Sequence, residues 1–310
     1  MRHMICKLRF HTAVRFGSDE GGSSLTGVSM TFRADTLFSA LFHAFLEQNR
    51  AEDFLQAVRD GRLVFSDAMP WKQDRFFLPK PIGLFARPGD AREEDPSRRK
   101  LLKKIAYIPS DLLRDFLSGR ADLIELHKLN QFGSAFEETR VNTRDGEQPL
   151  PYRVGGFRFA EDCGLYLIVS GDGEGLSLFE QGMTALAAGG IGGKTSSGWG
   201  KFSFEMGEAS DAWRSALDDD SAPRQMLLST ALPADDELSA ALEDAFYMLV
   251  RRGGFASSQE INPMKKQTVY LLSAGSTFRR RFAGTVLDVG VGMPHPVWRC
   301  ARGIFMGVSA

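Results

Sequence analysis

The sequence has only three cysteines and no apolar run long enough to cross a membrane. Cys6, Cys163 and Cys300 lie far apart and none belongs to a CxxC pair, which argues against a disulfide framework and against a cysteine zinc site. The N-terminus also lacks the apolar core of a secretory signal peptide. We therefore expect a cytoplasmic protein without membrane contact.

An excess of charge of one sign is missing too. The chain carries 38 Lys and Arg against 39 Asp and Glu, whereas free-standing nucleic-acid-binding domains are usually basic. The charges are nevertheless segregated: basic clusters occur at 98–100, 251–252, 265–266 and 279–281, and acidic clusters at 93–95, 218–220 and 235–237. Each cluster alone is typical of a solvated surface, but together they allow one RNA-facing side and other faces for protein partners.

Motifs of catalysis are also absent. The sequence has no His-Asp pair, no GGDD-type carboxylate motif and no HExxH motif. The acidic run 218–220 is followed by Ser-Ala-Pro, which indicates a loop rather than a metal site. We expect no catalytic residues, no bound metal and no cofactor.

What the sequence does have is a glycine-rich run at 189–202 (GGIGGKTSSGWGKF). Glycine lets backbone N–H groups approach a ligand closely, and successive N–H groups in such a turn bind anions. A P-loop-like nucleotide binder is a disfavoured alternative, because Ala188 stands where that motif needs its first glycine. In addition, the expected helix 176–188 precedes the run, while a strand, 201–206, follows it. The run predicts a cradle for the backbone of a phosphate polymer, with a solvated Gly/Ser loop as the alternative.

Apolar spacing predicts an α+β fold for residues 1–206. Strands are expected at 4–10, 75–81, 164–170 and 201–206, helices from Asp35 onward, at 110–113 and at 176–188, a charged loop at 86–100, and a projecting hairpin at about 137–160. Asp35 or Thr36 is the expected N-cap of the first helix. The order of these elements is that of a ferredoxin-like domain, which includes the hairpin and the glycine-rich loop 189–200.

The pattern restarts after residue 206. Strands are expected at 225–232, 245–250, 268–272 and 297–308. We predict that residues 207–310 form a second, degenerate ferredoxin-like domain that is mostly β.

Four stretches resemble a known family. Residues 28–41 (VSMTFRADTLFSAL), 77–81 (FLPKP), 189–202 and 293–299 (MPHPVWR) are similar to signatures of the RAMP superfamily of type III CRISPR systems. In combination they resemble the crRNA 5′-tag-binding subunit of the type III-A (Csm) effector, its fourth subunit. The resemblance implies two ferredoxin-like (RRM-related) domains and a non-catalytic RNA-binding role in antiviral defence. The partners it implies are the crRNA 5′ tag, the large palm-domain subunit and the adjacent RAMP backbone subunit.

RNA-binding residues are expected in three places. Single-stranded RNA is held by phosphate contacts and base stacking, which the loop can supply through Gly190, Gly192, Gly193, Lys194, Thr195, Ser196, Ser197 and Trp199, followed by Lys201. By resemblance, the hairpin is the thumb that wedges against crRNA, with Arg140, Asn142, Thr143 and Arg144. The third place is the end of the first strand and the start of the first helix, a natural phosphate site, with His11, Arg15, Arg33 and Ser39.

Local roles are the alternatives for several of these residues: a sheet-surface position for Lys201, local packing for His11 and a plain polar surface for the hairpin. At the level of function, one alternative is a RAMP-type endoribonuclease that processes crRNA precursors, with His11 or His43 as general base. Another is the equivalent subunit of a type III-B complex.

Overall fold

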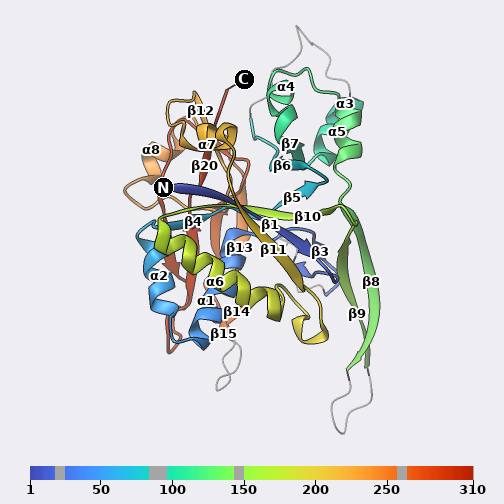
Figure 1. Ribbon diagram of the computed structural model, residues 1–310, viewed down its shortest axis with the longest axis vertical. Helices are drawn as coiled ribbons and strands as arrows, with labels where there is room; N and C mark the ends of the chain where they lie inside the picture. Colours follow the sequence, from blue (N-terminus) through green and yellow to red (C-terminus); the bar gives the residue numbers. More distant parts are fainter. Residues whose placement is uncertain (18–24, 84–95, 143–149, 257–263, 310) are drawn as a thin grey trace.

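The computed structural model describes residues 1–17, 25–83, 96–142, 150–256 and 264–309. At its centre is a seven-stranded sheet in which every pairing is antiparallel. The strands are β1 (Arg2–Phe10), β4 (Leu63–Phe65), β5 (Met69–Lys72), β6 (Arg75–Pro79), β7 (Tyr107–Pro109), β10 (Cys163–Gly171) and β11 (Phe202–Glu208). They run in the order β11-β1-β10-β5-β6-β7, with β4 also paired to β10 (Figure 1). A mixed α+β architecture with antiparallel sheets is confirmed.

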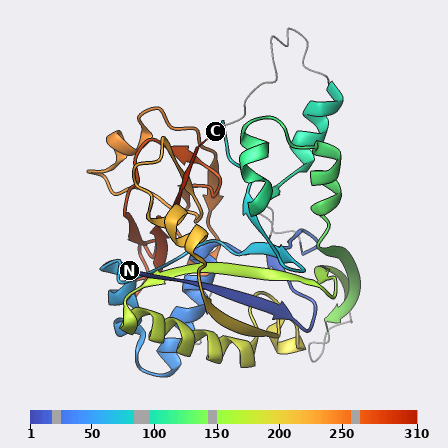
Figure 2. The ribbon, with the colours of Figure 1, turned by 45° about the horizontal axis from the view of Figure 1, so that its top comes forward.

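Helices cover one face of this sheet (Figure 2): α1 (Ala34–Glu47), α2 (Ala51–Arg59) and α6 (Gly173–Gly189). Apolar side chains recur along α1 at helical spacing, so Leu37, Phe38, Leu41 and Phe45 are all buried in the core. α6 packs closely on α1 at Gly182, where a Cβ atom would lie 2.6 Å from the Leu41 side chain. The predictions of both long helices are confirmed.

Part of the C-terminal half of the chain covers the other face of the sheet (Figure 2), while β18 (Gly284–Asp288) and β19 (Trp298–Arg302) pack against α1 and α2. Trp71 on β5 and Tyr166 on β10 share one buried cluster with Met226 and Met306 from the C-terminal half. Because β10 is packed from both sides, it is buried along its whole length. The core is therefore continuous across the expected boundary at 206.

The C-terminal half consists of short elements in small antiparallel sheets. They are α7 (Asp211–Asp218), β12 (Arg224–Leu227), α8 (Leu238–Leu242), β13 (Leu249–Arg252), β14 (Phe255–Ala256), β15 (Met264–Lys265), β16 (Val269–Leu272), β17 (Thr277–Phe278), β18 (Gly284–Asp288), β19 (Trp298–Arg302) and β20 (Phe305–Val308). The pairings are β17-β12-β20, β13-β16, β14-β15 and β18-β19. The strand expected at 297–308 is two strands, because the chain turns at Gly303, whose N–H bonds to the Ala283 carbonyl at 3.0 Å. The strand expected at 225–232 ends at Leu227, and the one expected at 245–250 begins only at Leu249.

A small helical insert joins the edge of the central sheet. It consists of α3 (Pro96–Lys104), η1 (Ser110–Leu112), α4 (Leu113–Leu117) and α5 (Leu123–Leu129), packed around Ile105, Ile108, Phe116 and Leu126. The short helix expected at 110–113 is confirmed. The expected loop at 86–100 is wrong from residue 96 on, because α3 is a polar helix with no buried side chain and so lacks the apolar stripe that marks a helix in sequence.

The projecting hairpin is formed by β8 (Gly133–Asn142) and β9 (Leu150–Phe159), paired over ten residues (Figure 1). Its base is also bonded to the chain after β1, since the N–H of Val14 bonds to the Phe157 carbonyl at 2.8 Å. Beside it, β2 (Phe16–Gly17) pairs with β3 (Val28–Ser29). Thr143 and Arg144, which were expected to contact RNA, lie outside the described residues, as does the side chain of Asn142.

Candidate nucleic-acid interface

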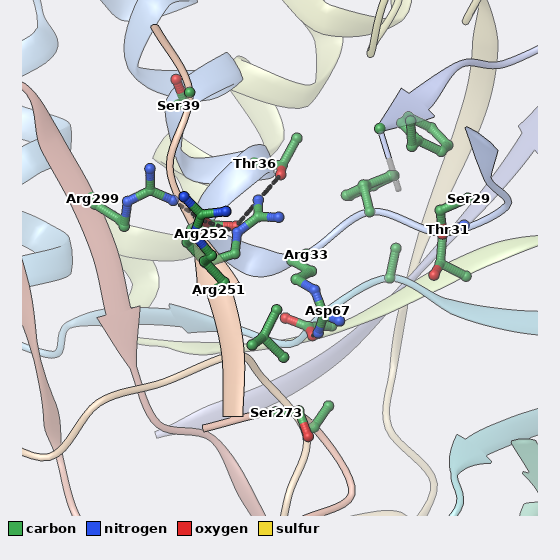
Figure 3. A pocket seen from close by; sticks show the side chains of 18 of the residues that line it. Ser29, Thr31, Arg33, Thr36, Ser39, Asp67, Arg251, Arg252, Ser273 and Arg299 are labelled. Carbon is green, nitrogen blue, oxygen red and sulfur yellow. Dashed lines mark hydrogen bonds and ion pairs between the residues drawn. The ribbon is translucent and has the colours of Figure 1, made fainter. Parts of the chain in front are cut away.

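A cleft of about 1350 Å³ is lined by both halves of the chain. One side is formed by the start of α1, the residues after β1 and part of the glycine-rich loop. The other side is formed by β13, the residues around β14 and β15, and β19. Figure 3 shows Arg252 and Arg299 of the second side reaching the first turns of α1, near Thr36. Segments more than 200 residues apart in sequence therefore share one surface.

The cleft is strongly positive. Of the described residues that line it, nine are lysine or arginine and two are acidic. The cations are Arg15, Arg33, Lys80, Lys103, Arg251, Arg252, Lys265, Lys266 and Arg299, and the acids are Asp35 and Asp67. Both aspartates are buried, with 4% and 6% of their surface exposed. A concave surface lined by one sign of charge concentrates its field and attracts a polyanion, even though the net charge of the chain is −1.

Asp67, which follows β4, caps the N-terminus of α1. Its Oδ1 accepts hydrogen bonds from the backbone N–H groups of Ala34 at 2.8 Å and Thr230 at 2.7 Å. Its Oδ2 accepts from the Thr230 hydroxyl at 2.7 Å and from Nη1 of Arg33 at 3.4 Å. Burial raises the pKa of Asp67, although Arg33 and the other donors oppose that shift. Asp67 thereby joins the start of α1 to the C-terminal half.

Asp35 forms a second connection between the halves. The expectation that Asp35 or Thr36 caps α1 is wrong, because the N-cap residue is Arg33 and the cap is supplied from outside the helix. Arg252 donates to Oδ2 of Asp35 from Nε and to Oδ1 from Nη2, both at 2.8 Å, and Arg299 forms a further ion pair with Oδ2. Burial raises the pKa of Asp35, but Arg252 and Arg299 outweigh it, and the pKa lies below its usual value of 3.8.

The glycine-rich loop is a fixed turn. Its Gly193 and Gly200 N–H groups bond to the Arg15 and Ala13 carbonyls at 2.8 Å and 2.7 Å. Gly200 has a φ of 76°, and a Cβ atom there would lie 2.1 Å from the Ile191 carbonyl oxygen, so only glycine fits. Among the described residues, the N–H groups of 192 and 194–196 have no partner. The loop thus offers an anion fewer backbone N–H donors than a turn in which all these groups are free. The free donors belong to residues 192 and 194–196.

Trp199 holds this loop against the hairpin. Trp199 is 8% exposed, and the centroid of its ring lies 5.6 Å from that of Phe136 on β8. Arg140 on β8 lies over the Trp199 ring at 5.1 Å, and its Nη1 donates to Oγ of Ser197 at 2.7 Å. The prediction that Trp199 stacks on a base is corrected, because a buried ring presents no free face to RNA. Arg140, too, is engaged between hairpin and loop.

Only some of the expected RNA-binding residues line the cleft. Those that line it are Arg15, Arg33, Ser39, Gly192 and Gly193. Those placed elsewhere are His11, Arg140, Gly190, Lys194, Thr195, Ser196, Ser197, Trp199 and Lys201. His11 is exposed and its Nε2 lies 3.0 Å from Oγ of Ser203 on β11, beside the exposed Lys201. Lys194 has its Nζ 3.2 Å from the Tyr152 hydroxyl of the hairpin.

Several cleft residues were missed as site residues. Arg251, Arg252, Lys265 and Lys266 stood out in the sequence as basic pairs, but a charge pair is usually a solvated surface. Arg299 lies within the resembling stretch 293–299, without any sign of its role. Their distance in sequence from α1 hid the shared surface.

The described residues contain no group of three or more His, Cys, Asp or Glu side chains arranged to hold a metal ion. Within the same residues, no helix is both long enough and apolar enough to span a bilayer.

Comparison with known proteins supplies the family. The model of the CRISPR Csm4 C-terminal domain matches residues 220–308. A Csm4 protein of the CRISPR system of Mycobacterium tuberculosis is 35% identical over 292 residues, which is 93% of each chain. The chain belongs to the Csm4 family. A Csm4 protein of Streptococcus thermophilus is 31% identical over 291 residues, 92% of this chain and 93% of its relative.

Solved structures with low sequence identity share the fold. A chain of a Csm3–Csm4 subcomplex of the type III-A interference complex matches with a TM-score of 0.67 at 17% identity, over 100% of both chains. A chain of a Csm1–Csm4 cassette in complex with AMPPNP matches with a TM-score of 0.62 at 19% identity, over 100% of this chain and 98% of that one.

Proposed function

We propose that this chain is a non-catalytic RNA-binding subunit of a type III-A effector that holds the 5′ repeat tag of the crRNA in the cleft. The observation that carries the proposal is the charge of the cleft: among the described residues nine cations line it, and the two carboxylates that line it are buried in internal bonds. Single-stranded RNA is bound chiefly by such positive grooves, which follow the phosphate backbone.

We further propose that the chain docks the large palm-domain subunit and an adjacent RAMP backbone subunit. The support is that similar chains occur in solved Csm1–Csm4 and Csm3–Csm4 assemblies. The order β11-β1-β10-β4, with α1 and α6 on one face, supports a ferredoxin-like first domain, and we extend that assignment to a degenerate second domain. A cytoplasmic location fits the three cysteines, which are all buried and free.

The proposal is tested by binding of a labelled crRNA that carries its 5′ tag, with and without the large subunit. The variant combines Lys103→Gln, Arg251→Gln and Lys265→Gln, three exposed residues that line the cleft. The control combines Arg2→Gln, Arg114→Gln and Lys128→Gln, which are exposed elsewhere. We expect the cleft variant to lose affinity and to reduce the slope of log K against log salt by about 2. Equal loss in both variants would refute the cleft as the binding site.

A second candidate is a metal-independent endoribonuclease, and one observation favours it: His43 lines the cleft, and burial and the nearby Lys266 lower its pKa. A histidine that is neutral at physiological pH can act as a general base. Cleavage of repeat RNA by the chain alone, abolished by His43→Ala, would establish this function. Binding without turnover supports the tag-holding role.

A further inference from the structure

The corner where α1 meets β13 and β19 contains more cationic side chains than carboxylates that could pair with them. Asp35 accepts two hydrogen bonds from Arg252 and an ion pair from Arg299, and Nη2 of Arg252 also donates to the Thr36 hydroxyl at 3.0 Å. Lys266 adds a third cation, within electrostatic reach of both arginines and of Asp35. One buried carboxylate thus faces three cations.

Backbone contacts fix the place of these cations. The N–H of Lys266 bonds to the Gly254 carbonyl at 2.9 Å, and Nη2 of Arg299 donates to the Gly253 carbonyl at 3.3 Å. Both contacts are made to the turn that follows β13, the strand that carries Arg252. The arrangement is therefore a consequence of how the C-terminal half folds, rather than of mobile surface side chains.

Two donors in this corner have no partner among the residues that the structure describes. In the described part of the chain, the ammonium group of Lys266 makes neither a hydrogen bond nor an ion pair, although Lys266 is only partly exposed. Nε of Arg299 is a buried donor without an acceptor, in a residue that is 7% exposed. A buried or half-buried cation that is left unpaired is costly, and an anion that arrives from the cleft would relieve that cost.

The pKa shifts agree with this imbalance. Burial, Arg299 and Arg252 all lower the pKa of Lys266, and only Asp35 raises it. Lys266 in turn contributes to the lowered pKa of His43 on the cleft side of α1. Burial is the largest cause of both shifts, and the neighbouring cations lower each pKa further, against the opposing effects of Asp35 on Lys266 and Glu47 on His43.

We infer that Lys266, with the cleft-facing Thr36, Ser39 and His43, forms a subsite for one phosphodiester of the bound RNA. Asp35 holds Arg252 and Arg299 behind it, and these two arginines supply the positive field. The subsite is separate from the glycine-rich loop, which borders the same cleft through Gly192 and Gly193. A phosphodiester fits because the offered groups are cations, hydroxyls and an imidazole. The inference rests on the proposed RNA-binding function.

The test compares Lys266→Gln and Lys266→Arg with Lys128→Gln, a control at an exposed lysine of α5 outside the cleft. Binding of a tag-bearing single-stranded RNA to the full chain is measured by fluorescence anisotropy at several salt concentrations. We expect Lys266→Gln to weaken binding about fivefold and to reduce the salt slope by about 0.7, the value for one phosphate contact on a single strand. Lys266→Arg and the control are expected to bind like the unmodified chain.

The two hypotheses fail in different ways. If Lys266→Gln keeps the affinity and the salt slope while the triple variant of Lys103, Arg251 and Lys265 loses them, the subsite is overturned and the RNA-binding function stands. If the unmodified chain and the triple variant bind alike, the proposed function is overturned, and the subsite with it. Thermal unfolding of each variant identifies any loss of RNA binding that is due to misfolding. In that case the difference in RNA affinity between Lys266→Arg and Lys266→Gln decides whether the charge at position 266 contributes to binding.

Discussion

At the scale of residues, the two buried aspartates carry much of the connection between the halves of the molecule. Asp67 accepts four hydrogen bonds and caps α1, and Asp35 accepts from two arginines more than 200 positions away. Neither carboxylate is free to repel RNA, because each is buried and already bonded. The same contacts that stabilise the fold thus leave the cleft positive.

We predict that Asp35→Asn lowers the free energy of unfolding by about 3 kcal/mol, because removal of one partner of a buried ion pair leaves the others uncompensated. The measurement is urea unfolding followed by circular dichroism. The control is Asp53→Asn, whose partner is Arg50 in an exposed ion pair of 3.2 Å, and a loss of about 0.5 kcal/mol is expected there. Equal losses would contradict the role given to Asp35.

The contribution of Asp35 should also depend on pH. Its pKa in the folded chain lies below the usual 3.8, so the carboxylate stabilises the fold fully above that value. The contribution is lost as the pH falls through the lowered pKa, where Asp35 takes up a proton. The stability difference between the unmodified chain and Asp35→Asn is therefore constant near neutral pH and decreases only below about pH 4. A difference that decreases between pH 8 and 6 would contradict this assignment.

At the scale of elements, sequence patterns succeed where a local cause decides the structure. The stripe of Leu37, Phe38, Leu41 and Phe45 predicts α1, and the alternating pattern predicts β9. Sequence patterns fail where a residue that is distant in sequence determines the local structure. Nothing near Ala34 in sequence indicates that Asp67 caps α1. The polar helix α3 contacts the core of the insert only through the partly buried Leu101 and Leu102 near its C-terminal end, too few apolar positions to mark a helix in the sequence.

The glycine-rich loop gives a prediction at this scale. Gly200→Ala should destabilise the chain by about 2 kcal/mol, because the new Cβ would clash with the Ile191 carbonyl at a positive φ. Gly207→Ala on β11 is the matched control, since a Cβ there has no atom within 4 Å. Thermal unfolding compares the two. A control that loses as much stability as Gly200→Ala would show that the turn is not specifically constrained.

The contact between the hairpin and the glycine-rich loop gives another prediction at the scale of elements. Arg140→Ala removes the bond to Ser197 and the contact over the Trp199 ring, so we expect faster amide exchange in β8 and in residues 195–199. Arg153→Ala, on β9 with a side chain 73% exposed, is the control and should leave exchange unchanged. Hydrogen exchange read by mass spectrometry checks both. Unchanged exchange in Arg140→Ala would mean that the other contacts of the loop, such as the Trp199 packing and the Gly193 and Gly200 N–H bonds, hold it without Arg140.

At the scale of the whole molecule, the cleft exists only because the C-terminal half packs over the start of α1. The sequence shows the basic pairs 251–252 and 265–266 and the loop 189–202 as separate features. It cannot show that Arg252 and Arg299 meet Asp35, since that contact depends on the tertiary packing of both halves. The general expectation of a phosphate-binding surface near the loop and α1 was available from the sequence. The side of the cleft that the C-terminal half contributes was not.

The most direct test of the proposed cleft is cross-linking of a crRNA whose 5′ tag carries a photoreactive nucleotide. The RNA is bound in a complex with this chain and the large subunit, and the modified peptides are identified by mass spectrometry. We predict uncleaved RNA, with cross-links in the cleft segments 31–43, 192–193, 248–255 and 265–268. Cross-links confined to the outer surface, for example to α7 or the exposed face of α5, would contradict it.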